Sequence, residues 1–394
     1  MARRPPEIVL SAPGIPDQAG LFRGVRRWLD RDPDVRVRVH WGFTNAQARS
    51  LSCDGLITDR GPGTEALLRR APFPIVSVAG RSGTDDQYFV AVDEHAVGRM
   101  AADHFREQGH WQFACVTYGS GEIGWDTQRE QGFAERLAEA GRSYAPLHVD
   151  DLPRDRRSPH IMAHNDTVRR RAIAAFVKAL PKPLAVFAGD DLLAIMVAGA
   201  CEHAGLGIPA DVALLGVNND PLCQLFGPPL SSVALPSDRV GYEAMATISA
   251  LVNGREDMPR RTLLPPLGVV VRPSSDALQV RDPVVGEALR YIRDDPRGAI
   301  GVKELAARVG MSRRALERRF RHAVGRTPGE EVQRLRSRLW RRLLTDTDLS
   351  MAEISQRCGF GAPATFAAAV RRAEGLAPSA YRQKARGSKV SDST

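Results

Sequence analysis

The sequence predicts an α/β domain built on parallel sheets, followed by a smaller all-α domain. Three observations lead to this prediction. Short apolar runs alternate with helix-length amphipathic segments from residue 7 to residue 272, which is typical of successive βα units. Beyond residue 282 the pattern is purely helical. This helical part contains a repeated motif and a surplus of positive charge.

The strands of the first domain are predicted from runs that are apolar or alternate in polarity. They lie at 8–11, 35–41, 54–58, 74–79, 89–92, 113–118, 184–188 and 212–217. Six amphipathic segments read as helices, at 20–29, 94–108, 127–140, 166–180, 190–204 and 238–252. This alternation predicts parallel sheets but leaves open a single barrel, one large sheet, or two doubly wound lobes with a cleft.

The domain limits follow from a change in composition. Residues 272–283 combine turn-forming residues with charge, and helical patterning begins directly after them. We therefore expect four parts, namely a first domain at 1–275, a linker at 276–285, a helical domain at 286–384 and a polar tail at 385–394.

Charge is distributed unevenly between these parts. Residues 281–394 hold 24 Lys and Arg against 13 Asp and Glu, whereas the rest of the chain holds 31 against 33. A basic segment joined to a near-neutral body is typical of a module that neutralises the phosphates of nucleic acid. A basic solvated surface would give the same counts, so charge alone leaves both interpretations open.

Several classes of protein are disfavoured. The five cysteines are scattered without a CxxC pair, which argues against a disulfide framework. No signal-peptide core precedes the first strand, and the longest apolar stretch, 192–201, is about half a membrane span, so we expect a cytoplasmic protein without a membrane partner. The sequence has no Gly-x-Ser-x-Gly or His-Glu-x-x-His motif and no Cys/His cluster, so no catalytic residue, metal or cofactor is predicted.

The basic domain contains one motif twice, at 303–312 and again 49 residues later at 352–361. Each copy has a small residue four positions before a glycine, which suits two helices that cross closely where the chain turns through a left-handed conformation. Each copy continues into an amphipathic helix and ends in Gly-x-x-Pro, at 325–328 and 375–378. The repeat therefore predicts two helix-turn-helix units.

The second helix of each unit is the candidate DNA reader. In the first unit, 312–322, the polar positions suit base edges near the helix start and phosphates further on. They are Ser312, Arg313, Arg314, Glu317, Arg318 and Arg321. The second unit, 363–373, is rich in alanine, and its candidates are Ala364, Thr365, Arg371 and Arg372. Alanine specifies little beyond contact with a thymine methyl, so we expect the second unit to read fewer bases.

These motifs resemble the AraC-type DNA-binding domain, in which two helix-turn-helix units are joined by a long helix. Here that helix is expected at 328–344. The similarity covers about 285–384 and ends with Pro378-Ser-Ala-Tyr-Arg382. The resemblance implies double-stranded operator DNA as a partner.

Polar residues in the first domain follow predicted strands or sit in an Arg-x-x-Gly-Phe motif, at the usual place for ligands in open α/β sheets. The candidates from the residues themselves are Trp125, Arg129, Asp190, Asn218 and Asp220. Carboxylates, amides and a guanidinium can bind vicinal hydroxyls, and an aromatic face can stack on a sugar ring. Each also has a structural interpretation, because Asp190 could merely cap a helix and 218–220 could merely turn the chain.

Together these segments resemble LacI-type and periplasmic sugar-binding domains. The resemblance implies two doubly wound lobes, with crossings near 110–119, 236 and 264, and a sugar cleft between them. It assigns sugar contacts to Arg129, Asp190 and Asn218, and places Asp17 at the cleft. The chain departs from the family pattern in reading Asp-Asp at 190–191 and Asn at 218.

A LacI-type sensor fused to an AraC-type domain is the arrangement of the xylose operon regulator family. Stretches at 230–234, 240–244, 264–266 and 282–293 are similar to that family as well. The resemblance implies a sugar-responsive activator of pentose utilisation genes, with D-xylose or a similar monosaccharide as effector. It further implies a homodimer, and RNA polymerase as a partner.

Two alternatives come from other classes. Gly119-x-Gly121-x-x-Gly124 is a formal dinucleotide fingerprint and would fit an NAD-dependent enzyme, although a lone match of this kind is weak. The other alternative is a sugar-binding protein of transport type without a regulatory role, which the basic helical domain argues against.

Overall fold

The computed structural model describes residues 4–12, 17–42, 50–59, 71–79, 88–119, 124–152, 167–255, 257–276, 282–295, 297, 301–347 and 349–387. The chain divides into two compact units. The first comprises 1–106 and 110–277, and the second comprises 107–109 and 278–394. No helix in the described ranges is long and apolar enough to cross a membrane.

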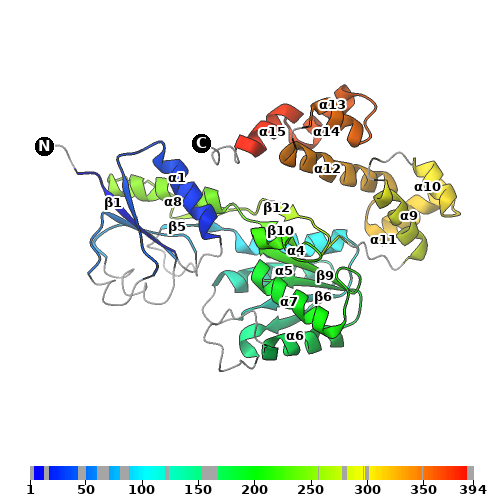
Figure 1. Ribbon diagram of the computed structural model, residues 1–394, viewed down its shortest axis with the longest axis horizontal. Coiled ribbons are helices and arrows are strands. Elements are labelled where there is room, and N and C mark those ends of the chain that lie inside the picture. The colour runs from blue at the N-terminus through cyan, green and yellow to red at the C-terminus, as the bar shows by residue number, and fades with distance from the viewer. Residues whose placement is uncertain are drawn as a thin grey trace. The chain divides into compact units, whose positions relative to one another are not determined.

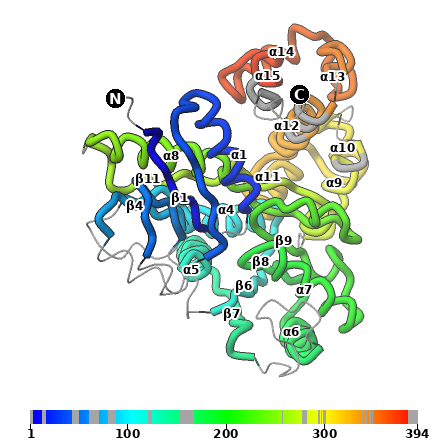
Figure 2. The backbone as a smooth tube through the Cα atoms, turned by 60° about the vertical axis from the view of Figure 1, so that its left-hand side comes forward, coloured from blue at the N-terminus to red at the C-terminus, as the bar shows by residue number. Residues whose placement is uncertain are grey.

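The first unit contains two six-stranded sheets, each at the core of one lobe. The first sheet has the order β11-β5-β4-β3-β1-β2, and its described strand pairs are parallel. Its strands are β1 (Glu7–Ser11), β2 (Arg36–Val39), β3 (Gly55–Thr58), β4 (Ile75–Ser77), β5 (Tyr88–Val92) and β11 (Arg261–Leu264). Helices α1 (Gln18–Leu29) and α8 (Ser237–Val252) lie side by side and pack on one face of this sheet, as Figures 1 and 2 show.

The second sheet has the order β12-β10-β9-β8-β6-β7, and β12 runs antiparallel to β10. Its strands are β6 (Phe113–Thr117), β7 (Ala145–His148), β8 (Leu184–Ala188), β9 (Val212–Asn218), β10 (Ser231–Ala234) and β12 (Gly268–Val270). Helices α4 (Glu94–Glu107) and α5 (Gly124–Ala138) pack on one face, and α6 (Thr167–Ala179) and α7 (Asp191–Ala204) on the other (Figure 1). Short 3₁₀ helices η1 (Val149–Asp151) and η2 (Pro221–Gln224) follow β7 and β9. The α/β region is therefore a pair of doubly wound lobes.

The chain passes between the two lobes three times. The first passage lies at Asp93, between β5 and α4, and not near 110–119 as expected from the sequence. The physical reason is that α4 buries Val97, Ala101 and Phe105 in the core of the second sheet, so the helix belongs to the second lobe. The other passages lie between β10 and α8 and between β11 and β12.

The second unit is helical and has two small cores joined by one long helix. Its helices are α9 (Pro283–Asp294), α10 (Val302–Arg308), α11 (Arg313–Val324), α12 (Pro328–Asp346), α13 (Met351–Arg357), α14 (Pro363–Glu374) and α15 (Pro378–Gly387). Helix α12 contributes Val332 and Leu335 to the first core, and Trp340 and Leu344 to the second. A capping box between Thr327 and Glu330 starts this helix.

Both helix-turn-helix units turn at a left-handed glycine. Gly310 has a φ of 68° and Gly359 a φ of 72°, a region where a side chain would clash with the backbone. The small residues four positions earlier, Ala306 and Ser355, are each 1% exposed where the helices cross. The predicted pair of helix-turn-helix units is confirmed.

Candidate functional site

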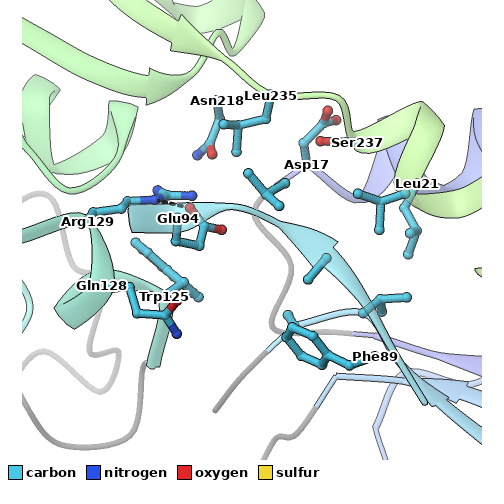
Figure 3. Close-up of a pocket in the computed structure, with 15 residues that line it drawn as sticks. Asp17, Leu21, Phe89, Glu94, Trp125, Gln128, Arg129, Asn218, Leu235 and Ser237 are labelled. Carbon is cyan, nitrogen blue, oxygen red and sulfur yellow. Dashed lines mark hydrogen bonds and ion pairs between the residues drawn. The ribbon is translucent and has the colours of Figure 1, made fainter. Parts of the chain in front are cut away.

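A pocket that is partly open to solvent is lined by residues from both lobes of the first unit. Most of the described lining residues are apolar, and they include the aromatic rings of Phe89 and Trp125. A small set of polar side chains is placed among these apolar groups (Figure 3): Asp17, Glu94, Gln128, Arg129, Asn218 and Ser237. A pocket with a few polar groups in an apolar wall is typical of a site for a small polar molecule.

Asp17 and Ser237 are brought together by a close crossing of α1 and α8. A Cβ atom on Gly24 would lie 1.8 Å from the carbonyl oxygen of Asp238, so only glycine permits this crossing. Asp17 is the N-cap of α1, and its Oδ1 accepts a hydrogen bond from the N–H of Gly20 at 2.8 Å. Ser237 begins α8, and the two side chains lie close together in Figure 3.

The second lobe positions Glu94 and Arg129 in the same way. A Cβ atom on Gly98 of α4 would lie 1.9 Å from the carbonyl oxygen of Arg129, and one on Gly132 of α5 would lie 2.0 Å from that of His95. The two helices can therefore approach until Arg129 Nε donates to Glu94 Oε2 at 2.6 Å.

Arg129 has three partners and is almost completely buried. Its Nη1 donates to the carbonyl oxygen of Gly189 at 2.6 Å, and its guanidinium lies 4.4 Å from the ring centre of Trp125. The side chain of Arg129 is 1% exposed, and that of Glu94 is 14% exposed. Burial raises the pKa of Glu94, and the positive charge of Arg129 opposes this rise.

Asn218 has a strained backbone and an unsatisfied side chain. Its φ is 110°, which is unfavourable for residues other than glycine, and that of Asn219 is 57°, in the left-handed region that asparagine tolerates. The turn is held by neighbours, since the Asn219 N–H donates to Ser232 Oγ at 2.8 Å and Arg272 donates to Asn219 Oδ1 at 2.6 Å. Asn218 Oδ1 is buried and accepts no hydrogen bond from any described residue. A buried amide oxygen of this kind is costly unless a bound molecule supplies a donor.

Asp190 and Asp220 do not line this pocket, because both carboxylates cap helices. Asp190 is 1% exposed, accepts the N–H of Leu193 at 2.7 Å as the N-cap of α7, and accepts the hydroxyl of Tyr118 at 3.1 Å. Asp220 accepts the N–H of Leu222 at 2.7 Å at the start of η2. The alternative interpretation of both residues, as caps and turn formers, matches these contacts.

Two further buried carboxylates lie in the second lobe. Asp126 is 0% exposed and accepts the N–H groups of Tyr118 and Gly119 at 2.6 and 3.2 Å. Burial raises the pKa of Asp126 to about 7. Asp191 accepts from Ser232 Oγ at 2.6 Å, and burial raises its pKa to about 6.

The pocket thus gathers Asp17, Trp125, Arg129 and Asn218 from the predicted set and adds residues that the sequence did not single out. Glu94 was missed because an acidic residue at a helix start is usually explained by the helix dipole. Gln128 was missed although it is adjacent to Arg129. Of the glycine motif, residues 120–123 lie outside the described residues, and Gly124 begins α5.

The first candidate DNA reader, α11, exposes a basic face. Ser312 caps the helix through a hydrogen bond from Ala315 N–H at 3.3 Å, while Leu316 and Phe320 are buried beneath it. Arg313, Arg314, Arg318 and Arg321 are exposed, and Arg313 pairs with Glu317 at 2.8 Å. A surface depression is lined by Arg314, Glu317, Arg318, Arg321 and one residue not predicted, His322.

The second candidate reader, α14, presents a different surface. Phe366 and Val370 are buried, and the predicted contact residues are all exposed: Ala364, Thr365, Arg371 and Arg372. Its two arginines lie in the last turn, while the first turn carries no charge. A helix of this composition can approach phosphates at its end but offers few groups that read bases.

Two family descriptions match the chain. Residues 102–275 match a periplasmic binding protein-like domain, and residues 305–384 match a helix-turn-helix domain. Among solved structures, that of a xylose-binding transcription activator is similar, with 27% identity and a TM-score of 0.59 over 96% of this chain and 98% of that one. A cellobiose-bound regulator with a TM-score of 0.56 and 22% identity, covering 69% of this chain and 85% of that one, shares the fold of the first unit.

Curated relatives extend this similarity over most of the sequence. The xylose operon regulatory protein of Escherichia coli K12 is 31% identical over 339 residues, 84% of this chain and 83% of the relative. The protein of the same name from Haemophilus influenzae is 27% identical over 89% of this chain and 90% of its own length. These relatives are transcription regulators, which confirms the expectation of a sugar-responsive DNA-binding regulator and not an enzyme. The chain belongs to the family of xylose operon regulatory proteins.

Proposed function

We propose that this regulator is a cytoplasmic homodimer that binds D-xylose in the pocket of its first unit and then activates genes for pentose use. The observation that carries the proposal is the pocket itself, where Asp17, Arg129, Asn218 and the Trp125 ring meet in a chain that also has two helix-turn-helix units. The names of the relatives supply the identity of the sugar.

The chemistry of the pocket suits a small polyol. Each hydroxyl of a sugar both donates and accepts, so it can donate to the carboxylate of Asp17 or to the amide oxygen of Asn218. The apolar faces of the sugar would lie against Trp125 and the aliphatic wall. Because these groups come from both lobes, one bound sugar would bridge the lobes.

Bridging gives a mechanism for regulation. Sugar shifts the protein toward the arrangement that it binds better, so DNA affinity changes only if the two arrangements differ in their affinity for sugar. In this proposal the closed lobes reposition the paired helical units. Helix α11 reads bases, α14 contacts phosphates, and the bound dimer then engages RNA polymerase.

A gel-shift titration tests this function. DNA from promoters of pentose-utilisation genes is titrated with the protein in the absence of sugar and with D-xylose, L-arabinose or D-ribose. D-xylose should raise DNA affinity. Trp125→Ala should lose the response because it removes the ring next to Arg129. Trp41 is 71% exposed and does not line the pocket, so Trp41→Ala should keep the response. Unchanged DNA affinity with every pentose would refute the proposal.

A further inference from the structure

Glu94 offers one carboxylate oxygen to the pocket. Its Oε2 accepts from Arg129 at 2.6 Å, and its Oε1 accepts no hydrogen bond from any described residue. The side chain is 14% exposed, so it is largely buried but still reaches the pocket. In Figure 3 the second oxygen points away from Arg129. A carboxylate has about four acceptor sites, so Glu94 retains the capacity to bind a donor.

Arg129, in contrast, is buried and already contacts three neighbours in the protein. Two of its nitrogens are engaged by Glu94 and by the carbonyl oxygen of Gly189, and one guanidinium face lies over Trp125. With 1% of its side chain exposed, Arg129 acts mainly through Glu94, whose carboxylate it orients. The more exposed partner of this ion pair is the acid.

A second group among the described lining residues also lacks a partner and is an acceptor as well. Asn218 Oδ1 is buried without a donor from the described residues. Among the residues that the structure describes, the lining contains two carboxylates, Asp17 and Glu94, and one guanidinium, that of Arg129. A ligand that donates several hydrogen bonds fits this arrangement, whereas a negatively charged ligand would face repulsion in a site of low dielectric constant.

We infer that Glu94 binds the effector directly by accepting hydroxyl protons at Oε1, and that its negative charge makes the pocket select neutral sugars over sugar acids. The inference rests on the proposed function, since it names the residue that sets the specificity of that site. It makes a distinctive prediction for the partner of Glu94. Once the carboxylate is removed, the buried guanidinium of Arg129 lacks a counter-ion, and a carboxylate on the ligand can replace it.

Isothermal titration of the full-length protein with D-xylose and D-xylonate tests this inference. Glu94→Gln should weaken D-xylose binding about tenfold or more, because it removes a charged acceptor. The same variant should bind D-xylonate more tightly than wild type does. Glu139→Gln is the matched control. The side chain of Glu139 is 46% exposed, lies outside the pocket and forms ion pairs with Arg99 and Arg136 on the same two helices. This variant loses those ion pairs and should bind both ligands as wild type does.

Glu94→Asp provides a second variant that retains the charge. Its shorter side chain should weaken D-xylose binding while still rejecting D-xylonate, which a purely structural role of Glu94 does not predict. Equal D-xylose affinity of Glu94→Gln and wild type would overturn the inference. An equal loss of affinity for D-xylose and for D-xylonate in Glu94→Gln would overturn it as well. If the wild-type protein binds none of the neutral sugars, the proposed function itself fails, and the inference fails with it.

Discussion

The two helix-turn-helix units differ in the residues that their second helices expose. Helix α11 exposes arginines in its first turn, where a recognition helix meets base edges, and α14 exposes Ala364 and Thr365 at the corresponding place. Arginine can bind guanine through two hydrogen bonds, while alanine contacts only a thymine methyl group. The first unit therefore accounts for most of the sequence specificity that we expect.

This asymmetry predicts the effect of arginine substitutions on operator binding. Arg314→Ala should weaken operator binding by ~1 to 3 kcal/mol if the arginine contacts a base. Arg313 pairs with Glu317 in the free protein and would leave this partner to contact DNA, so Arg313→Ala should weaken operator binding by a similar amount. Arg371→Ala should lower affinity equally for all sequences. Gel shifts with operator and unrelated DNA measure both effects. Arg26→Ala on α1, 78% exposed, serves as the control, and equal operator binding by all variants would contradict the prediction.

Asp126 predicts a specific dependence of stability on pH. Burial raises its pKa from an ordinary 3.8 to about 7, so the folded protein binds this proton more tightly than the unfolded chain does. The contribution of this carboxyl group to the free energy of unfolding is fully present below about pH 4 and is lost as the pH rises to about 7. Asp126→Asn cannot ionise. Its free energy of unfolding relative to wild type should therefore rise by roughly 1 to 4 kcal/mol across this window.

Urea unfolding at pH 4.5, 6 and 7.5 measures this difference. Asp257→Asn is the control, because the ion pair with Arg255 lowers the pKa of Asp257 and its ionisation is complete below this window. The control should show a difference from wild type that does not change between pH 4.5 and 7.5. The same constant difference for Asp126→Asn would show that its carboxyl ionises normally in the folded protein.

At the scale of elements, two pairs of helices that cross at glycines hold the polar residues of the pocket in position. Gly98→Ala would place a Cβ atom 1.9 Å from the carbonyl oxygen of Arg129, so α4 and α5 must move apart. We expect a loss of ~1 to 3 kcal/mol in stability, as for other overpacked sites, and weaker sugar binding because Glu94 and Arg129 move with the helices. Thermal unfolding and titration calorimetry measure the two effects.

Gly199→Ala in α7 is the matched control. A Cβ atom there meets only the Arg170 side chain, at 3.8 Å, an ordinary contact distance. Alanine in place of this mid-helix glycine should stabilise the protein by up to about 1 kcal/mol and leave sugar binding unchanged. If Gly98→Ala behaved like this control, the close crossing would not be needed for the pocket.

The sequence predicts elements best where the hydrophobic pattern is strong. The eight apolar runs all correspond to strands, whereas four strands were missed: β7, β10, β11 and β12. Strand β7 contains Pro146 and His148, and β11 has only four residues, of which the first is Arg261. Short edge strands of this kind are held by pairing with distant strands, which local patterns do not report.

The pocket was predicted only in part for a related reason. Arg129 belongs to a recognisable motif, Trp125 lies four residues before it, and Asn218 is the last residue of a buried strand. Glu94 and Ser237 begin helices that are far apart in the sequence, and only the crossings with α5 and α1 bring them to the site. Asp190 and Asp220 had the expected position in the sequence, but their short carboxylates bind the helix N-termini that they precede.

For the whole molecule, sugar binding should appear as added stability. A ligand that binds only the folded protein stabilises it by about 2.7 kcal/mol at one hundred times its dissociation constant. D-xylose should therefore raise the melting temperature of the full-length protein, progressively with concentration. Differential scanning calorimetry with D-xylose and, as a control, glycerol measures this shift. A melting temperature that D-xylose does not change would contradict binding to the pocket.

The discontinuous first lobe has a consequence for synthesis on the ribosome. Strands β1 to β5 are complete by residue 92, but α8 and β11, which cover and extend their sheet, end only at residues 252 and 264. Leu21 and Val25 of α1 therefore lack their partners on α8 while the whole of residues 93–236 is being translated. The nascent first lobe must wait for its last two elements with apolar surface uncovered, during which a chaperone can bind it.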